Sequence, residues 1–161
     1  MSMAAHLLVS GLVALLPVLC FLGTLLYLDG YKLVTLRVIF ALVACGAVAA
    51  GASFVVNGIA FDAAGLDLPR FTRYVSPLTE ELLKGLVIVA LIHFHRIGFL
   101  VDAAICGFAV GTGFAVVENL YYLDRARDAG LGTWLVRGFG TAIMHGGTTA
   151  MFGVMSLAMA E

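Results

Sequence analysis

This sequence contains few charged residues, and the shortage excludes an ordinary soluble domain. Charged side chains make up 12% of the 161 residues, whereas soluble domains carry about 25%. Hydrophobic side chains make up 62%, and the mean hydropathy is +1.07. The formal net charge is −1, so no excess of positive charge favours nucleic acid as a partner. We expect an integral membrane protein whose partners include the lipid bilayer and no nucleic acid.

Compact metal-binding patterns are also missing, since neither CxxC nor HExxH occurs. The three cysteines, Cys20, Cys45 and Cys106, lie inside apolar runs. We expect them to be small buried hydrophobic side chains rather than disulfides or ligands. No basic segment or small-residue cleavage site accompanies the first apolar run, which indicates a retained span rather than a removed signal peptide.

Several apolar runs are long enough to cross a membrane. The expected spans are His6–Leu28, Leu33–Ile59, Pro77–His93, Gly98–Leu123 and Leu135–Ala160. They predict an all-α, polytopic transmembrane bundle of about five spans, forming one domain over residues 1–161. An odd number of spans places the two termini on opposite sides. The N-terminus, a surface loop at 61–75 and a polar loop at 124–133 would share one side.

Residue types near the span ends predict local roles. Ser76 is a suitable cap for the third span, with Pro77 at its first helical position. Asn57 is expected to cap the end of the second span rather than to bond another helix. Tyr121, Tyr122 and Trp134 flank the loop at 124–133, as interfacial aromatic residues do.

The stretch Ser76–Lys84 is the most unusual part of the chain, because it places Glu80, Glu81 and Lys84 at the head of an apolar run. Charged residues at membrane depth are costly and therefore have a partner or a function. The spacing puts all three on one side of a helix, which must face protein or water.

Two later spans each present one ionisable group on a face of small residues, which permits close helix contact. In the fourth span the stripe consists of Ala103, Gly107, Gly111 and Glu118. In the fifth span it consists of Gly138, Ala142, His145, Thr149 and Gly153. Glu118 and His145 are therefore expected to face other helices rather than lipid.

Counting helix turns places the polar groups of three spans in the same half of the bilayer. These groups are Glu80, Glu81, Lys84, Glu118, Asn119 and His145. Asp102 lies about 24 Å along the helix from Glu118, so we exclude it from the site. Such a cluster suits hydrolysis, with a glutamate as the general base. Alternatively, Glu81, Glu118 and His145 bind a divalent metal ion, with zinc as the first choice.

Three short motifs on these spans resemble those of a known family. Glu80-Glu81-Leu82-Leu83-Lys84 matches EExxK, Phe114 to Asn119 matches FxxxEN, and His145 to Ala150 with Gly153 matches HxxxTAxxG. Together, within residues 70–155, they resemble the PrsW family of intramembrane proteases. This family is distantly related to CAAX prenyl endopeptidases and bacteriocin-processing membrane proteases.

The resemblance implies a polytopic peptidase, often classed as metal-dependent, in a bacterial cytoplasmic membrane. It implies a membrane-tethered protein substrate such as an anti-sigma factor. Glu80 or Glu81 would then be the general base or a metal ligand, and Lys84 would hold the pair. His145 would orient water or bind metal, and Asn119 would stabilise an oxyanion. Glu118 stands where the prenyl-endopeptidase relatives have histidine.

Two other function classes are compatible with intramembrane carboxylates. An ion- or proton-coupled transporter would require polar groups on both sides of the midplane and internal repeats, whereas the sequence has one cluster and no convincing repeat. A non-catalytic membrane scaffold would use the cluster only as structural ion pairs. In a scaffold, changing a glutamate to glutamine would alter the stability of the protein rather than any catalytic turnover.

Overall fold

The fold is known from a computed structural model, which describes residues 3–29, 34–126 and 128–160. The helices are α1 (Met3–Leu28), α2 (Leu36–Ala64), α3 (Leu68–Arg70), α4 (Ser76–His93), α5 (Leu100–Arg125), α6 (Leu131–Thr141) and α7 (Thr148–Ala160). Two π-helical segments, η1 (Phe71–Val75) and η2 (Ala142–Gly147), join α3 to α4 and α6 to α7. No strand occurs in these ranges, which confirms the predicted all-α class.

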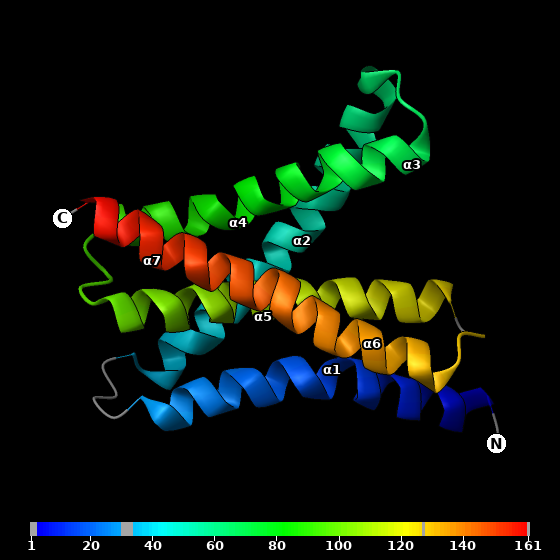
Figure 1. Ribbon diagram of the computed structural model, residues 1–161, viewed down its shortest axis with the longest axis horizontal. Helices are drawn as coiled ribbons and strands as arrows, with labels where there is room; N and C mark the ends of the chain where they lie inside the picture. The colour runs from blue at the N-terminus through cyan, green and yellow to red at the C-terminus, as the bar shows by residue number, and fades with distance from the viewer. Residues whose placement is uncertain (1–2, 30–33, 127, 161) are drawn as a thin grey trace.

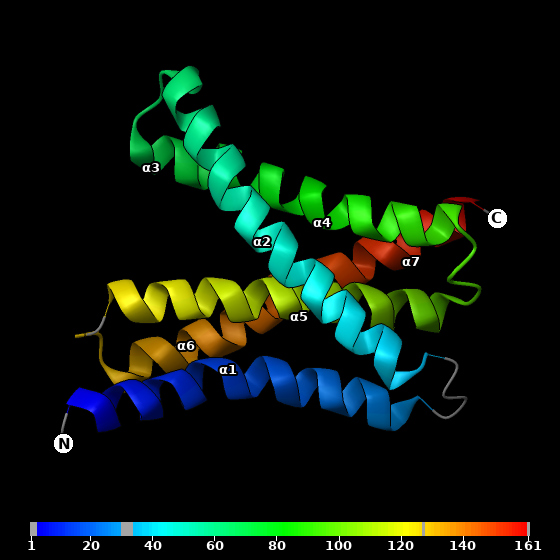
Figure 2. The same cartoon turned by 180° about the vertical axis from the view of Figure 1, so that it is seen from behind.

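Helix α5 forms the centre of the bundle (Figure 1). It contacts α1, α2, α4, α6, η2 and α7, and Figure 2 shows α2 crossing its other side. Its most apolar 18-residue window is 72% buried, against 28–33% for the other three long apolar helices. A helix surrounded in this way needs small side chains, which explains why the fourth apolar run is rich in glycine and alanine.

The two small-residue stripes pack against each other. A Cβ atom at Gly107 would lie 2.5 Å from the carbonyl oxygen of Thr149, and one at Gly111 would overlap the backbone of His145. A Cβ atom at Gly153 would approach the carbonyl oxygen of Ala103 to 2.8 Å. The expectation that each stripe contacts another helix closely is therefore confirmed, and the structure shows that the two stripes contact each other, which brings the backbone of His145 against α5.

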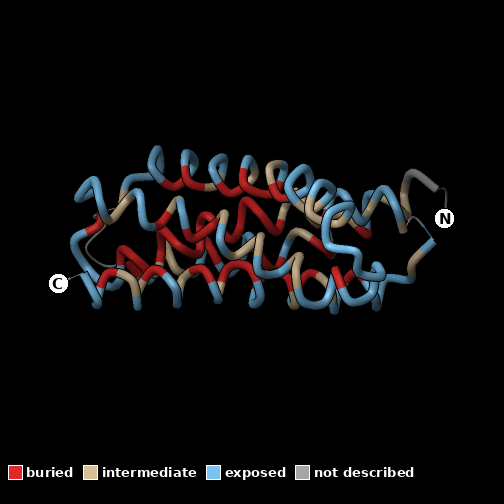
Figure 3. Tube along the Cα trace, turned by 90° about the horizontal axis from the view of Figure 1, so that it is seen from above, coloured by how far each residue is buried: buried red, intermediate tan, exposed pale blue. Residues whose placement is uncertain are grey.

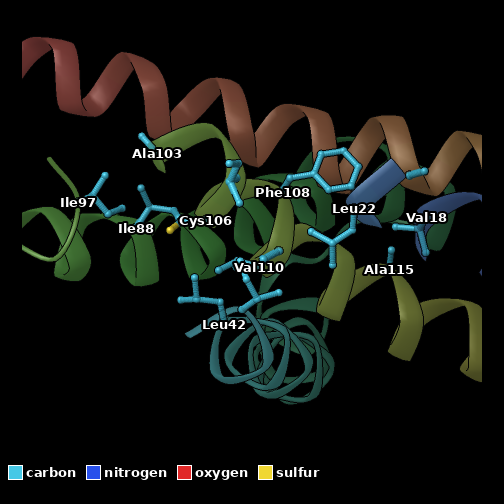
Figure 4. Packing of buried hydrophobic residues seen from close by; sticks show 14 of the residues in the cluster. Val18, Leu22, Leu42, Ile88, Ile97, Ala103, Cys106, Phe108, Val110 and Ala115 are labelled. Atoms are coloured by element: carbon cyan, nitrogen blue, oxygen red, sulfur yellow. The ribbon is translucent and has the colours of Figure 1, made fainter. Parts of the chain in front are cut away.

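Buried residues follow the inner faces of the helices, while outer faces are exposed along the whole length (Figure 3). The core around α5 is built from α1 residues Val18 and Leu22, from Leu42 of α2 and from Ile88 of α4, together with Phe108 and Val110 of α5 itself (Figure 4). Large apolar side chains cover the outside, as a lipid-facing surface requires.

Among the described residues, four helical runs are long and apolar enough to cross a membrane, namely Ala5–Leu28, Leu36–Ala64, Leu100–Arg125 and the continuous α6–η2–α7 run Leu131–Ala160. The fifth expected span, α4, is not among them and carries Glu80, Glu81 and Lys84. Its outward face is nevertheless apolar, since Leu78, Leu82, Leu86 and Val89 are exposed along it. The charged side of α4 faces the bundle, and the two ends of the chain lie at opposite ends of the molecule (Figure 1).

Several local predictions are wrong. Residues 68–75 are helical, so the expected loop shrinks to the turn between Ala64 and Leu68. Because the helix continues from η1 into α4, Ser76 is not a cap, and Asp67 instead accepts a hydrogen bond from Arg70 N at 2.9 Å. Asn57 joins two helices, donating from Nδ2 to Ser76 Oγ at 2.8 Å and accepting from Thr79 Oγ1.

The burial of three side chains also differs from expectation. Cys20 and Cys45 are exposed on the bundle surface, and only Cys106 is buried. Trp134 is 1% exposed and packs inside the bundle instead of joining an interfacial belt. An apolar run indicates that a residue lies in a span. Because lipid allows the outer face of a span to be apolar as well, the run does not indicate whether that residue is buried or exposed. Leu33, the expected start of the second span, lies outside the described residues.

Candidate active site

One cavity of about 380 Å³ is lined by four of the five ionisable groups of the expected site, all except Lys84. Glu80 and Glu81 reach it from α4, Glu118 from α5 and His145 from η2. Thr72 and Ser76 close one side, and Tyr122, Arg137, Gly140, Thr141 and Met144 line others. Segments far apart in the sequence therefore meet at one place.

Three of these side chains, Glu81, Glu118 and His145, form a continuous hydrogen-bonded row with Lys84. His145 Nε2 lies 2.6 Å from Glu118 Oε2, and His145 Nδ1 lies 3.0 Å from Lys84 Nζ. Lys84 Nζ donates to Glu81 Oε1 at 2.6 Å. Thr148 Oγ1 lies 3.4 Å from both carboxylate oxygens of Glu81. The imidazole is thus held from both ring nitrogens.

Lys84 is fully buried, which requires every donor of its ammonium group to be satisfied. Besides Glu81 and His145, the ammonium faces the ring of Phe114, whose centroid is 4.6 Å away. The same ring packs against His145, with a centroid distance of 4.8 Å. The phenylalanine that opens the FxxxEN motif therefore supports both the cation and the histidine.

Glu80 stands apart from this row. Its carboxylate accepts a hydrogen bond from Ser76 Oγ at 2.9 Å, and Ser76 in turn accepts from Asn57 of α2. No ion pair of Glu80 is found among the described residues, although Glu118, His145 and Lys84 are near enough to interact with it electrostatically. Glu80 is thus a half-buried cavity carboxylate, and the two glutamates of EExxK have different surroundings.

Asn119 and Asp102 do not line the cavity. Asn119 Nδ2 donates to the carbonyl oxygen of Ala14 at 3.1 Å and to Thr141 Oγ1 at 2.9 Å. Both amide hydrogens are used to join α5 to α1 and α6, which differs from the expected role as an oxyanion donor. Asp102 lies in the first turn of α5, far along the helix from Glu118.

Sequence reasoning missed Arg137 as a member of the site. Arg137 Nη2 donates to Glu118 Oε1 at 2.9 Å, and its guanidinium carbon lies 3.7 Å from the centroid of the Tyr122 ring. The arginine sits two turns before His145 in the same run and one residue from Gly138 in the small-residue stripe. That position was the available signal, since it places a cation near the face that carries His145.

Comparison with known families decides the identity of this arrangement. A model described as the PrsW family intramembrane metalloprotease matches residues 34–161. The chain belongs to the PrsW family. Comparison with curated proteins and with solved structures finds no significant match.

Membership of the PrsW family makes the chain a peptidase of the intramembrane class and an integral membrane protein acting on a membrane protein substrate. The matched region contains α2 to α7 and therefore every residue that lines the cavity. Helix α1 lies outside it but packs against α5 and α6.

The family description implies a metal ion, and the donor types agree with it, since carboxylates and imidazole are zinc ligands. Their arrangement does not fit one. Within the described ranges, no three His, Cys, Asp or Glu side chains are grouped to hold a metal ion. A zinc ion bound between His145 Nε2 and Glu118 Oε2 would hold these atoms about 3.4 Å apart, whereas they are 2.6 Å apart.

Proposed function

We propose that this chain is an intramembrane endopeptidase that hydrolyses a peptide bond of a membrane-associated protein, with Glu80 as the general base. The observation that carries the proposal is the difference between the carboxylates of the cavity. Glu81 is paired with Lys84, and Glu118 with Arg137 and His145. Glu80 has only the Ser76 hydroxyl group, so its oxygens are accessible to a water molecule.

In the proposed reaction, Glu80 accepts a proton from water as the water oxygen bonds to the scissile carbonyl carbon. The carbonyl oxygen becomes an oxyanion, and the guanidinium group of Arg137 on the cavity wall stabilises it. Glu80 then gives the proton to the leaving amine as the carbon–nitrogen bond breaks. His145, held by Glu118 and Lys84, keeps a fixed position beside the reacting carbonyl.

The proposed substrate is a membrane-tethered protein of the anti-sigma-factor kind, and the proposed location is a bacterial cytoplasmic membrane. Both rest on family resemblance. We also propose that residues 1–161 act as one domain, because Asn119 ties the carbonyl group of Ala14 in α1 to the helix that carries Glu118.

Substitution of the two adjacent glutamates tests the assignment. In proteoliposomes containing a membrane-tethered reporter, Glu80→Gln should lower cleavage about 10²- to 10⁴-fold, as loss of a general base does. Glu81→Gln keeps a hydrogen-bonding group beside Lys84 and should lower cleavage far less. Thermal unfolding of both variants serves as the control for folding. Retained cleavage in Glu80→Gln and in His145→Ala would contradict the proposal.

A further inference from the structure

The fully buried Lys84 lies between Glu81 and His145. An ammonium group has three donors and no acceptor. A neutral imidazole has one nitrogen that carries a lone pair and one that carries hydrogen. When the ammonium donates to Nδ1, that atom is the lone-pair nitrogen, and Nε2 carries the hydrogen that Glu118 accepts.

In this tautomer the only lone pair of the His145 ring, on Nδ1, accepts a hydrogen bond from Lys84, so none is free for a metal ion. Histidine that ligates a metal through one nitrogen normally donates its other N–H to a carboxylate, a carbonyl group or water. Here the group at Nδ1 is itself a donor, so coordination through Nε2 would require a doubly deprotonated ring. The arrangement around His145 is the reverse of a metal-ligand arrangement.

We propose that the ammonium group of Lys84 is the resident cation of this site and prevents a divalent metal ion from binding His145. The charges are consistent with this, because Lys84 and Arg137 balance two of the three carboxylates that line the cavity. Loss of Lys84 frees Nδ1 and leaves three carboxylates with one cation. The remaining donors are of the types that bind zinc, and without the lysine between them they are free to close around one ion.

The inference builds on the location of the proposed active site, but its test measures metal content and needs no activity. The full-length protein in detergent is treated with chelator, loaded with Zn²⁺, washed and analysed for zinc per chain. Wild type should stay at background, and Lys84→Met should gain about one zinc ion per chain. Lys84→Met/His145→Ala should lose that gain. Arg96→Met, a change in the turn that follows α4, is the control and should match wild type.

Each outcome of this experiment decides the question. Wild-type protein that holds stoichiometric zinc, lost in His145→Ala, overturns the inference. A Lys84→Met protein that folds but binds no more zinc than wild type overturns it as well. If Lys84→Met does not fold, ¹⁵N imidazole shifts of wild type decide, because the inference requires an Nε2–H ring for His145 that added zinc leaves unchanged. An Nδ1–H ring or a zinc-dependent shift contradicts it. Failure here leaves the Glu80→Gln result intact, so the two proposals fail separately.

Discussion

At the scale of single residues, two of the three carboxylates that line the cavity have partners of opposite charge, and Glu80 has only a hydroxyl partner among the described residues. Glu118 is held by Arg137 and His145, and Glu81 by Lys84. Buried charges are tolerated only when they are paired and hydrogen-bonded. These ion pairs therefore stabilise a polar site inside an apolar bundle. They also distinguish the paired carboxylates of Glu81 and Glu118 from the unpaired carboxylate of Glu80.

Replacement of Arg137 should affect catalysis more than stability. Arg137→Gln removes the proposed oxyanion donor and should lower kcat about 10²-fold, with a smaller change in KM. Arg137→Lys should recover only part of this loss, because lysine lacks the planar fork that pairs with Glu118 and stacks on Tyr122. Steady-state kinetics on the reporter measure both constants.

Arg70 is the matched control for Arg137. It forms a 3.5 Å ion pair with Asp67 in which both side chains are mostly exposed, so Arg70→Gln should leave kinetics and stability unchanged. An equal loss of activity in both arginine variants would remove the proposed role of Arg137.

At the scale of elements, the packing of α5 against α7 and η2 determines where His145 lies. The chain forms a π-helical turn at Ala142–Gly147, the segment that contains His145. Such turns occur frequently at functional sites because they redirect a side chain without ending the helix. A second π-helical turn, η1, directly precedes α4 and reaches the cavity with Thr72.

A methyl group added at Gly111 should push η2 away from α5. Gly111→Ala places a Cβ atom against the backbone of His145 and should lower the free energy of unfolding by about 1–3 kcal/mol. Cleavage should fall as well, because Glu118 and His145 move apart. Denaturant titration in mixed micelles measures the stability.

Gly58 in α2 is the matched control for Gly111, because a Cβ atom there meets nothing within 4 Å. Gly58→Ala should be neutral or slightly stabilising, by up to about 1 kcal/mol. If both alanine variants were destabilised to the same extent, close packing at Gly111 would not be the cause.

At the scale of the whole molecule, the chain runs along the bundle in five passes, and the cavity lies where α4, α5 and the α6–η2–α7 run come together. The turn between α2 and α3 lies at the end of the molecule where the chain begins, and the turn between α4 and α5 lies at the end where the chain finishes (Figure 1). The apolar outer stripe of α4 leads us to expect that it crosses the membrane with the other helices.

Labelling from one side of the membrane tests this topology. In a background in which Cys20, Cys45 and Cys106 are replaced, Leu66→Cys and Gly98→Cys place single thiols at the two turns that flank the helical run from α3 through η1 to α4. A membrane-impermeant maleimide added to sealed vesicles should label one variant, and the other only after the vesicles are opened. Equal labelling of both in sealed vesicles would mean that α4 does not cross.

The sequence by itself determined the class of protein, the small-residue faces and four of the residues that meet in the cavity, Glu80, Glu81, Glu118 and His145. These follow from composition and helical spacing, because lipid requires complete helices and a costly charge must face inward. Only the tertiary structure distinguished the surroundings of Glu80 from those of Glu81. It also showed that Asn119 joins α5 to α1 and α6 and that Arg137 lines the cavity. Which donor meets which acceptor depends on the axial positions and rotations of helices far apart in the chain, and spacing within one helix carries no information about either.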